Sequence, residues 1–321
     1  MSKTDPSFGP SIEAHKEHDM LFLKQFETSS CTPIEYNGFN SKLARDRKAH
    51  VYPTTNVWFE PLVNQKPSDP SVILSAMLLA KERCESTGQG FTIFVADLQL
   101  YKVALDVMLN FPRLFDKSFI LVLGGMHLLM NFISCIGNLM ESSGLSKVLE
   151  STFGSVKKML SGKLFPQNLR ALRFIFEEIL RPFIPSVDTY DELIQFLNEK
   201  ASSSPTCKCL VDLFCKPILL CLIYLRAERE SNFQLHIWCV EQMVVYFFAA
   251  GHTNYARMAW YYSKTMLNIP ADALLRFKKG LFSTRRADDC YNGIWLDILI
   301  ETTLIKKGSS SNIGLVGIAD D

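Results

Sequence analysis

Two short apolar runs, separated by one helical segment, constrain the fold more than any other feature of this sequence. Phe91-Thr-Ile-Phe-Val-Ala96 and Ser118-Phe-Ile-Leu-Val-Leu-Gly124 are rich in β-branched and aromatic residues, as buried strands are. A helical pattern at about 100–109 and a turn at Pro112 lie between them. Because this spacing suits a crossover connection, we expect two parallel strands joined by a helix.

The remaining pattern after Ser71 predicts helices. A first helix is expected over about 71–85, before the glycines of Thr87-Gly-Gln-Gly90. Nine more are expected over about 126–140, 145–160, 168–182, 189–200, 208–228, 233–250, 254–267, 271–279 and 292–306. The sequence therefore predicts an α/β remnant within a mostly helical chain.

Charge and cysteine content limit which functions and which cellular compartments the sequence suggests. The 34 Lys and Arg residues balance 33 Asp and Glu residues, which removes the bulk electrostatic argument for nucleic-acid binding but allows a local basic patch. Nine cysteines, an odd number scattered through apolar runs, favour reduced thiols in an intracellular protein of the nucleus or cytoplasm. The N-terminus shows no apolar run typical of a secretory signal.

Residues 119–140 carry no formal charge except on a protonated His127, and they are long enough to span a bilayer. The stretch also contains three glycines, two asparagines and a serine, whose polar groups a spanning helix would have to satisfy in lipid. We therefore expect no membrane partner.

Asp97 and His127 follow the two predicted strands at the same relative place. Parallel strands bring their carboxyl ends to one edge of the sheet, where α/β folds hold ligands and metals, so both side chains are expected on one rim. Simpler interpretations remain open. Asp97 would also serve as the N-cap of a helix starting at Leu98, and His127 as a hydrogen-bonded core histidine. The glycines of Leu123-Gly-Gly-Met-His127 are expected to permit an unusual backbone turn.

Asp297 and Glu301 lie four residues apart on one side of a predicted helix whose apolar residues surround the whole cylinder. Two ionised carboxylates in such a buried helix require a cation. Either a divalent metal supplies it, or Arg285 and Arg286 form a structural network with the acids.

A basic run lies just before this helix. It contains five cations and no acid, and it suggests a phosphate-facing patch or a merely solvated face: Arg276, Lys278, Lys279, Arg285 and Arg286. The sequence contains no glycine-rich phosphate loop, nucleophile elbow, kinase motif set or zinc-protease helix.

Several segments together resemble uncharacterised, transposon-associated proteins of invertebrate genomes. They are Phe94-Val-Ala-Asp-Leu-Gln-Leu-Tyr101, Leu123-Gly-Gly-Met-His-Leu-Leu-Met-Asn-Phe132, Cys135-Ile-Gly-Asn-Leu-Met-Glu-Ser-Ser-Gly-Leu145, Gly251-His-Thr-Asn-Tyr-Ala256 and Gly293-Ile-Trp-Leu-Asp-Ile-Leu-Ile-Glu301. That group is in turn distantly similar to the ribonuclease-H-like transposases of the Mutator and related superfamilies. The resemblance covers about 75–310.

The resemblance implies a site. Asp97 would be the second catalytic acid, His127 the associated histidine, Glu301 the third acid and Asp297 its neighbour. The three acids would hold Mg²⁺ or Mn²⁺ for cleavage of DNA. The basic run, independently of the resemblance, supplies the candidate contacts to nucleic acid: Lys278, Lys279, Arg285 and Arg286. On this basis residues 1–70 form an irregular region, 71–140 an α/β half-core, 141–290 a helical insertion, 291–308 a helix returning to the core, and 309–321 a tail.

Two departures from that pattern predict weak or absent activity. The first acid is missing, since Asp46 and Glu60 stand in unconvincing contexts, and the glycine-rich segment after the third acid is reduced. A metal site without its first acid should bind metal poorly. The alternative function is a non-catalytic helical module for protein interaction.

Overall fold

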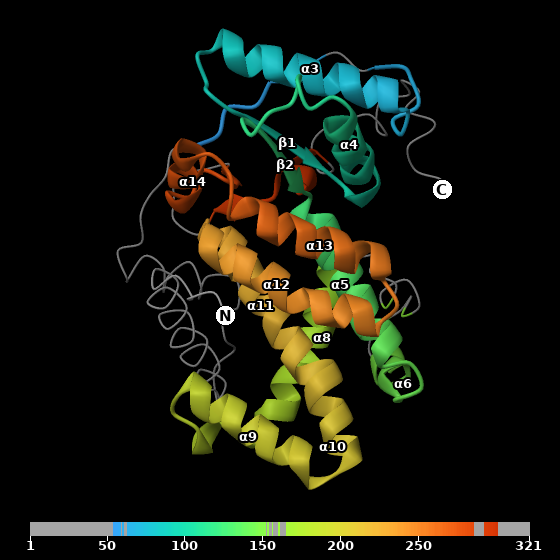
Figure 1. The fold of residues 1–321 in the computed structure, drawn as a ribbon. Coiled ribbons are helices and arrows are strands. Elements are labelled where there is room, and N and C mark those ends of the chain that lie inside the picture. Colours follow the sequence, from blue (N-terminus) through green and yellow to red (C-terminus); the bar gives the residue numbers. More distant parts are fainter. Residues whose placement is uncertain are drawn as a thin grey trace.

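Helices make up most of the fold and surround one small parallel sheet (Figure 1). The computed structural model describes residues 54–58, 60, 63–151, 153, 156, 160, 165–285 and 292–300. A mostly helical chain with a short parallel pair was the expected fold class, and this coarse expectation is confirmed.

The sheet consists of β1 (Thr92–Ala96) and β2 (Phe119–Leu123). The two strands are parallel, with Thr92 opposite Phe119 and Ala96 opposite Leu123. Helix α4 (Leu98–Asn110) makes the crossover between them. The predicted strands at 91–96 and 118–124 are thus correct to within one residue at each end.

Two helices lie beside the sheet, at the upper end of the molecule in Figure 1. α3 (Pro70–Ser86) begins after Asp69, whose side chain accepts a hydrogen bond from the backbone N–H of Ser71. Its buried residues Ile73 and Met77 face the core, and the helix packs against α4 and β1.

Helix α5 (Gly125–Leu139) leaves the sheet directly after β2 and runs into the helical body. Side chains around most of its circumference are buried, among them Leu129, Phe132 and Ile136. The uncharged stretch 119–140 is therefore a strand followed by a helix. No helix in the described part of the chain is long and apolar enough to cross a membrane.

The helical body contains the following elements: α6 (Leu145–Glu150), α8 (Phe165–Leu180), the 3₁₀ turn η2 (Ile184–Ser186), α9 (Tyr190–Ser203), α10 (Pro205–Leu210), the π-turn η3 (Val211–Cys215), α11 (Lys216–Arg229), α12 (Phe233–Ala249), α13 (Thr253–Met266) and α14 (Ala271–Lys278). α12 and α13 pack against each other, and α13 also contacts α4 and β2. α13 thereby joins the helical body to the sheet.

The predicted single helix over 208–228 is interrupted by the π-turn η3. Pro217 has no N–H and its ring collides with the carbonyl four residues earlier, so an α-helix cannot continue regularly through it. The N–H of Lys216 bonds instead to the carbonyl of Val211, five residues back, which widens the turn before the proline.

The described C-terminal part returns to the sheet. β3 (Thr284–Arg285) pairs antiparallel with β4 (Gly293–Ile294), and α15 (Leu296–Ile300) packs against α5 and β1. The helix expected over 292–306 therefore begins only at Leu296, because the residues before it form a strand.

Candidate functional site

The residues that follow the two parallel strands meet a distant helix at one end of the sheet. Asp97 follows β1, and His127 lies in the first turn of α5, which follows β2. Asp297 comes from α15, 170 residues after His127, and its carboxylate contacts that histidine. The structure thus brings Asp297 to the rim that Asp97 and His127 share.

Asp97 is the N-cap of α4. Its Oδ1 accepts a hydrogen bond of 2.8 Å from the backbone N–H of Leu100. This confirms the simpler interpretation of Asp97, because the bond satisfies one of the N–H groups that a helix start leaves open. The side chain is half-buried and also borders a pocket, so capping does not remove it from solvent.

Asp297 caps α5 from outside the helix. Its Oδ2 lies 3.1 Å from the backbone N of His127 and 3.1 Å from the Nδ1 of the same residue. The residue at the N-cap position is Gly124, which has no side chain to accept a bond. The carboxylate of Asp297 takes that role, and the positive end of the helix dipole favours its charge.

This contact explains the two glycines. Gly124 has φ of −59°, so it does not adopt the unusual backbone that the sequence suggested. A Cβ at Gly124 would instead lie 2.7 Å from the Asp297 Oδ2, and one at Gly125 would lie 2.1 Å from the Trp295 Cδ1. The glycines provide space for residues 295–297 to dock against the start of α5.

A pocket of about 320 Å³ opens beside this contact. It is lined by Asp97, Leu98, Gln99, Lys102, His127, Asn254 and Tyr255, from α4, α5 and α13. His127 has 29% of its side chain exposed, whereas Asp297 behind it has 10%. The pocket therefore offers an imidazole, a carboxylate, an ammonium group, amides and a phenol to a ligand.

Tyr255 is tied to the other polar groups of this pocket. Asn131 donates one hydrogen bond of 2.8 Å to the Tyr255 hydroxyl and another of 3.0 Å to the carbonyl of His127. Burial, followed by the nearby charges of Asp97 and Asp297, raises the pKa of Tyr255. The phenol therefore stays protonated at neutral pH and can donate a hydrogen bond.

Sequence reasoning did not assign roles to Lys102, Asn254 or Tyr255. Asn254 and Tyr255 stand within one of the segments that carry the family resemblance, Gly251-His-Thr-Asn-Tyr-Ala256, which was the available signal. Their place at the pocket depends on how α13 packs against the sheet, and local sequence does not specify that packing.

The described residues do not by themselves form a metal centre. The carboxylates and imidazole that could ligate a metal here belong to Asp97, Asp297 and His127. One carboxylate oxygen of each acid already accepts a backbone hydrogen bond. Within the described ranges, no three His, Cys, Asp or Glu side chains are grouped closely enough to hold a metal ion.

The described lysines of the predicted site do not line the pocket. Glu301 and Arg286 lie outside the described residues. Lys278 and Lys279 are exposed at the end of α14, beyond the C-terminus of α13, whereas Asn254 lies at the N-terminus of α13. Neither lysine is among the residues that line the pocket.

Arg285 corrects the expectation of a continuous basic patch. It is 3% exposed, and its guanidinium bonds to the hydroxyl of Ser231. A buried guanidinium does not contact a phosphate on the surface. In the described chain the carboxylate of Asp297 contacts His127, and Arg286, one of the two arginines considered for a structural network with the acids, lies outside the described residues.

A second histidine–carboxylate pair lies within the helical body. His236 on α12 contacts Glu228 on α11 through Nδ1, and its Nε2 lies 3.0 Å from the hydroxyl of Tyr262 on α13. The side chains of His236 and Glu228 are each 4% exposed. This network joins three helices, and its burial makes the His127 pair the better candidate for a functional site.

Comparisons with known proteins identify a family. A profile described as a domain of unknown function (DUF8702) matches residues 35–192 and 184–320. The chain belongs to the DUF8702 family. No curated protein and no solved structure shows significant similarity to it.

Proposed function

We propose that this DUF8702 chain is a ribonuclease-H-like domain of transposable-element origin, which binds a nucleic-acid backbone at the pocket beside Asp97 and His127. The observation that carries this proposal is the contact of Asp297 with His127, at the same end of the sheet as Asp97. Acids and a histidine from three distant segments thus gather at the carboxyl ends of parallel strands, where α/β folds place their ligand sites.

The chemistry of the pocket suits a phosphodiester. Lys102 supplies a cation, while Asn254 and the protonated Tyr255 supply neutral hydrogen-bond donors. Such groups bind phosphate oxygens without reading the base sequence. We expect binding of DNA with weak or no cleavage, because the described donors are too few for a pair of catalytic metal ions.

The test is DNA affinity measured by fluorescence anisotropy, with Lys102→Met compared with Lys147→Met. Lys147 is an exposed lysine of α6 outside the pocket, so both variants lose one positive charge. We expect Lys102→Met to weaken binding by about tenfold at 0.1 M salt, which corresponds to about 1.4 kcal/mol, and to reduce the salt slope by about one. Equal affinities of the two variants would refute binding at this pocket.

A non-catalytic helical interaction module is the second candidate. It is favoured by the fact that Asp97 and Asp297 each accept a backbone N–H at the start of a helix. If these acids are only caps, the chain shows no DNA affinity beyond that of an unrelated protein of similar charge.

A further inference from the structure

The outer edge of β2 offers backbone hydrogen-bonding groups. The ladder with β1 begins with a 2.8 Å bond from the Thr92 N–H to the Ser118 carbonyl and ends with a 2.7 Å bond from the Gly124 N–H to the Ala96 carbonyl. Because backbone groups alternate in direction along a strand, residues 118, 120, 122 and 124 face β1. The N–H and C=O groups of Phe119, Leu121 and Leu123 therefore face the other way.

Leu121 is the central residue of that outer edge. Phe119 uses its N–H in a turn bond to the carbonyl of Asp116. The N–H and C=O of Leu121 have no hydrogen-bond partner within the described parts of the chain. Unpaired groups on an edge strand are a template for another strand.

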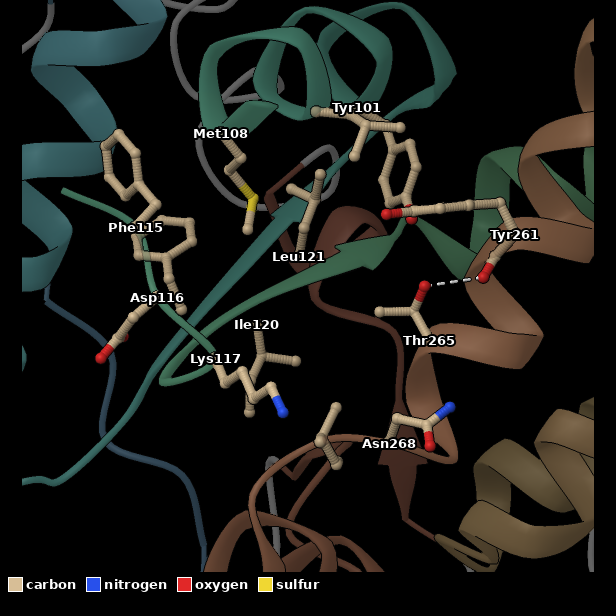
Figure 2. Close-up of a pocket in the computed structure, with 13 residues that line it drawn as sticks. Tyr101, Met108, Phe115, Asp116, Lys117, Ile120, Leu121, Tyr261, Thr265 and Asn268 are labelled. Atoms are coloured by element: carbon tan, nitrogen blue, oxygen red, sulfur yellow. Dashed lines mark hydrogen bonds between the residues drawn. The ribbon is translucent and has the colours of Figure 1, made fainter. Parts of the chain in front are cut away.

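A hollow of about 400 Å³ lies against this edge (Figure 2). Phe119, Ile120 and Leu121 all line it. Successive strand residues point to opposite faces of a sheet, so a hollow that touches all three lies at the edge of the strand. Its other walls come from α4, with Tyr101, Leu105 and Met108, and from α13 and the residues after it, with Tyr261, Thr265, Asn268 and Ile269.

One carboxylate and one ammonium group line the hollow, from Asp116 and Lys117. The carboxylate of Asp116 already accepts bonds from the N–H and hydroxyl of Ser118. Lys117 is exposed and has no ion-pair partner among the described residues. Figure 2 shows the side chains of Lys117 and Asn268 on the side of the hollow away from α4. An occupant with an acidic group would complement Lys117.

We propose that this hollow binds an extended peptide segment of a partner protein, which pairs with Leu121 as a third strand of the sheet. Main-chain pairing satisfies the edge groups, and one apolar side chain of the peptide packs against Leu105 and Met108. An acidic side chain of the peptide pairs with Lys117. Three residues of β2 line the hollow, which gives room for about three peptide residues at roughly 3.3 Å each.

The probe is a set of acetylated, amidated hexapeptides that alternate Val, Ile or Thr with polar positions, one of which is Glu. The full-length protein carries ¹⁵N-leucine, and hydrogen exchange at the Leu121 amide is followed by NMR. Peptides of this set are expected to slow that exchange at least tenfold. If no peptide in the set slows it, the proposal is wrong.

Two controls separate main-chain pairing from simple filling of the hollow. The same peptides with an N-methyl group on the central amide keep their side chains but lose a backbone donor, and they should bind at least tenfold more weakly. Equal binding of the methylated peptides overturns the proposal. The proposal is also overturned if an aromatic sulfonate such as anilinonaphthalene sulfonate binds the hollow while none of the unmethylated peptides binds.

The matched protein variants are Asn268→Trp and Leu267→Trp. Both positions are exposed and adjacent, but Asn268 lines the hollow and Leu267 does not. Asn268→Trp is expected to abolish peptide binding, while Leu267→Trp retains it. Retained binding in Asn268→Trp places the peptide elsewhere and contradicts the proposal.

Discussion

Asp97 and Asp297 perform the same local task by different routes. Asp97 caps the helix that it precedes, whereas Asp297 caps a helix 170 residues earlier in the chain, whose own N-cap residue is glycine. Each carboxylate therefore has a structural role that must be separated from any functional one before a loss of activity is interpreted.

Two substitutions at Asp97 measure its structural role separately from any functional one. Asp97→Ala is expected to lower the free energy of unfolding by about 1 kcal/mol, because the N–H of Leu100 loses its acceptor. Asp97→Asn keeps an oxygen at that position and should cost a few tenths of a kcal/mol. Urea denaturation measures both, with the exposed Asp106→Ala on the same helix as control. If Asn proves as destabilising as Ala, capping is not the role of this side chain.

His252 makes stability depend on pH. Burial lowers the pKa of His252 below its usual 6.5, and its Nε2 lies 3.1 Å from the amide Nδ2 of Asn138, which donates to the neutral ring. The unfolded chain therefore binds a proton more readily than the folded chain. The contribution of His252 is present above pH 6.5 and is lost as the pH falls through and below that value.

Urea midpoints of the native protein and of His252→Gln, measured at several values between pH 7.5 and 5, test this dependence. The native protein should lose more stability on acidification than the variant does. Parallel curves for the two proteins would show that His252 does not contribute.

At the scale of elements, the docking of residues 295–300 on α5 depends on small residues. Trp295 occupies the space that a Cβ of Gly125 would need, and its ring stacks on Tyr224 with centroids 5.6 Å apart. The α15 segment is therefore fixed between α5 and α11, and this placement sets the position of Asp297.

Gly125→Ala should destabilise the protein by about 2–3 kcal/mol, because the added methyl group overlaps the Trp295 ring. A double-mutant cycle with Trp295→Leu checks the cause, since the combined cost should fall short of the sum of the single costs. Additive costs would mean that Gly125 is constrained by something other than Trp295.

The sequence predicted those features that depend on neighbouring residues and not those that depend on contacts between distant segments. The strands and the cap at Asp97 depend on neighbouring residues, and the sequence indicated them. The contact of Asp297 with His127, the burial of Arg285 and the position of Tyr255 at the pocket depend on packing between distant segments. Residue pattern alone does not encode those distances, so the site was predicted only in part.

At the scale of the whole molecule, the described chain lacks a group of three metal-binding side chains. A metal bound only to the native state, at ten times its Kd, would add about 1.4 kcal/mol and raise the melting temperature by roughly 2 °C. We expect no such rise at millimolar Mn²⁺. The native protein and Asp97→Asn should each melt at the same temperature with metal as without it. A rise that Asp97→Asn abolishes would contradict this and show that residues outside the described ranges complete a metal site.

The contact between Asp297 and His127 also affects the order in which the structure can form during translation. The two residues are 170 positions apart, so translation at about 5–20 residues per second separates their appearance by roughly 10 to 30 s. The sheet is made before that interval and the helical body is synthesised during it, while the start of α5 has no carboxylate from α15. A nascent chain therefore forms the contact between Asp297 and His127 after the surrounding framework, and ribosome stalling before residue 297 would leave that framework without this contact.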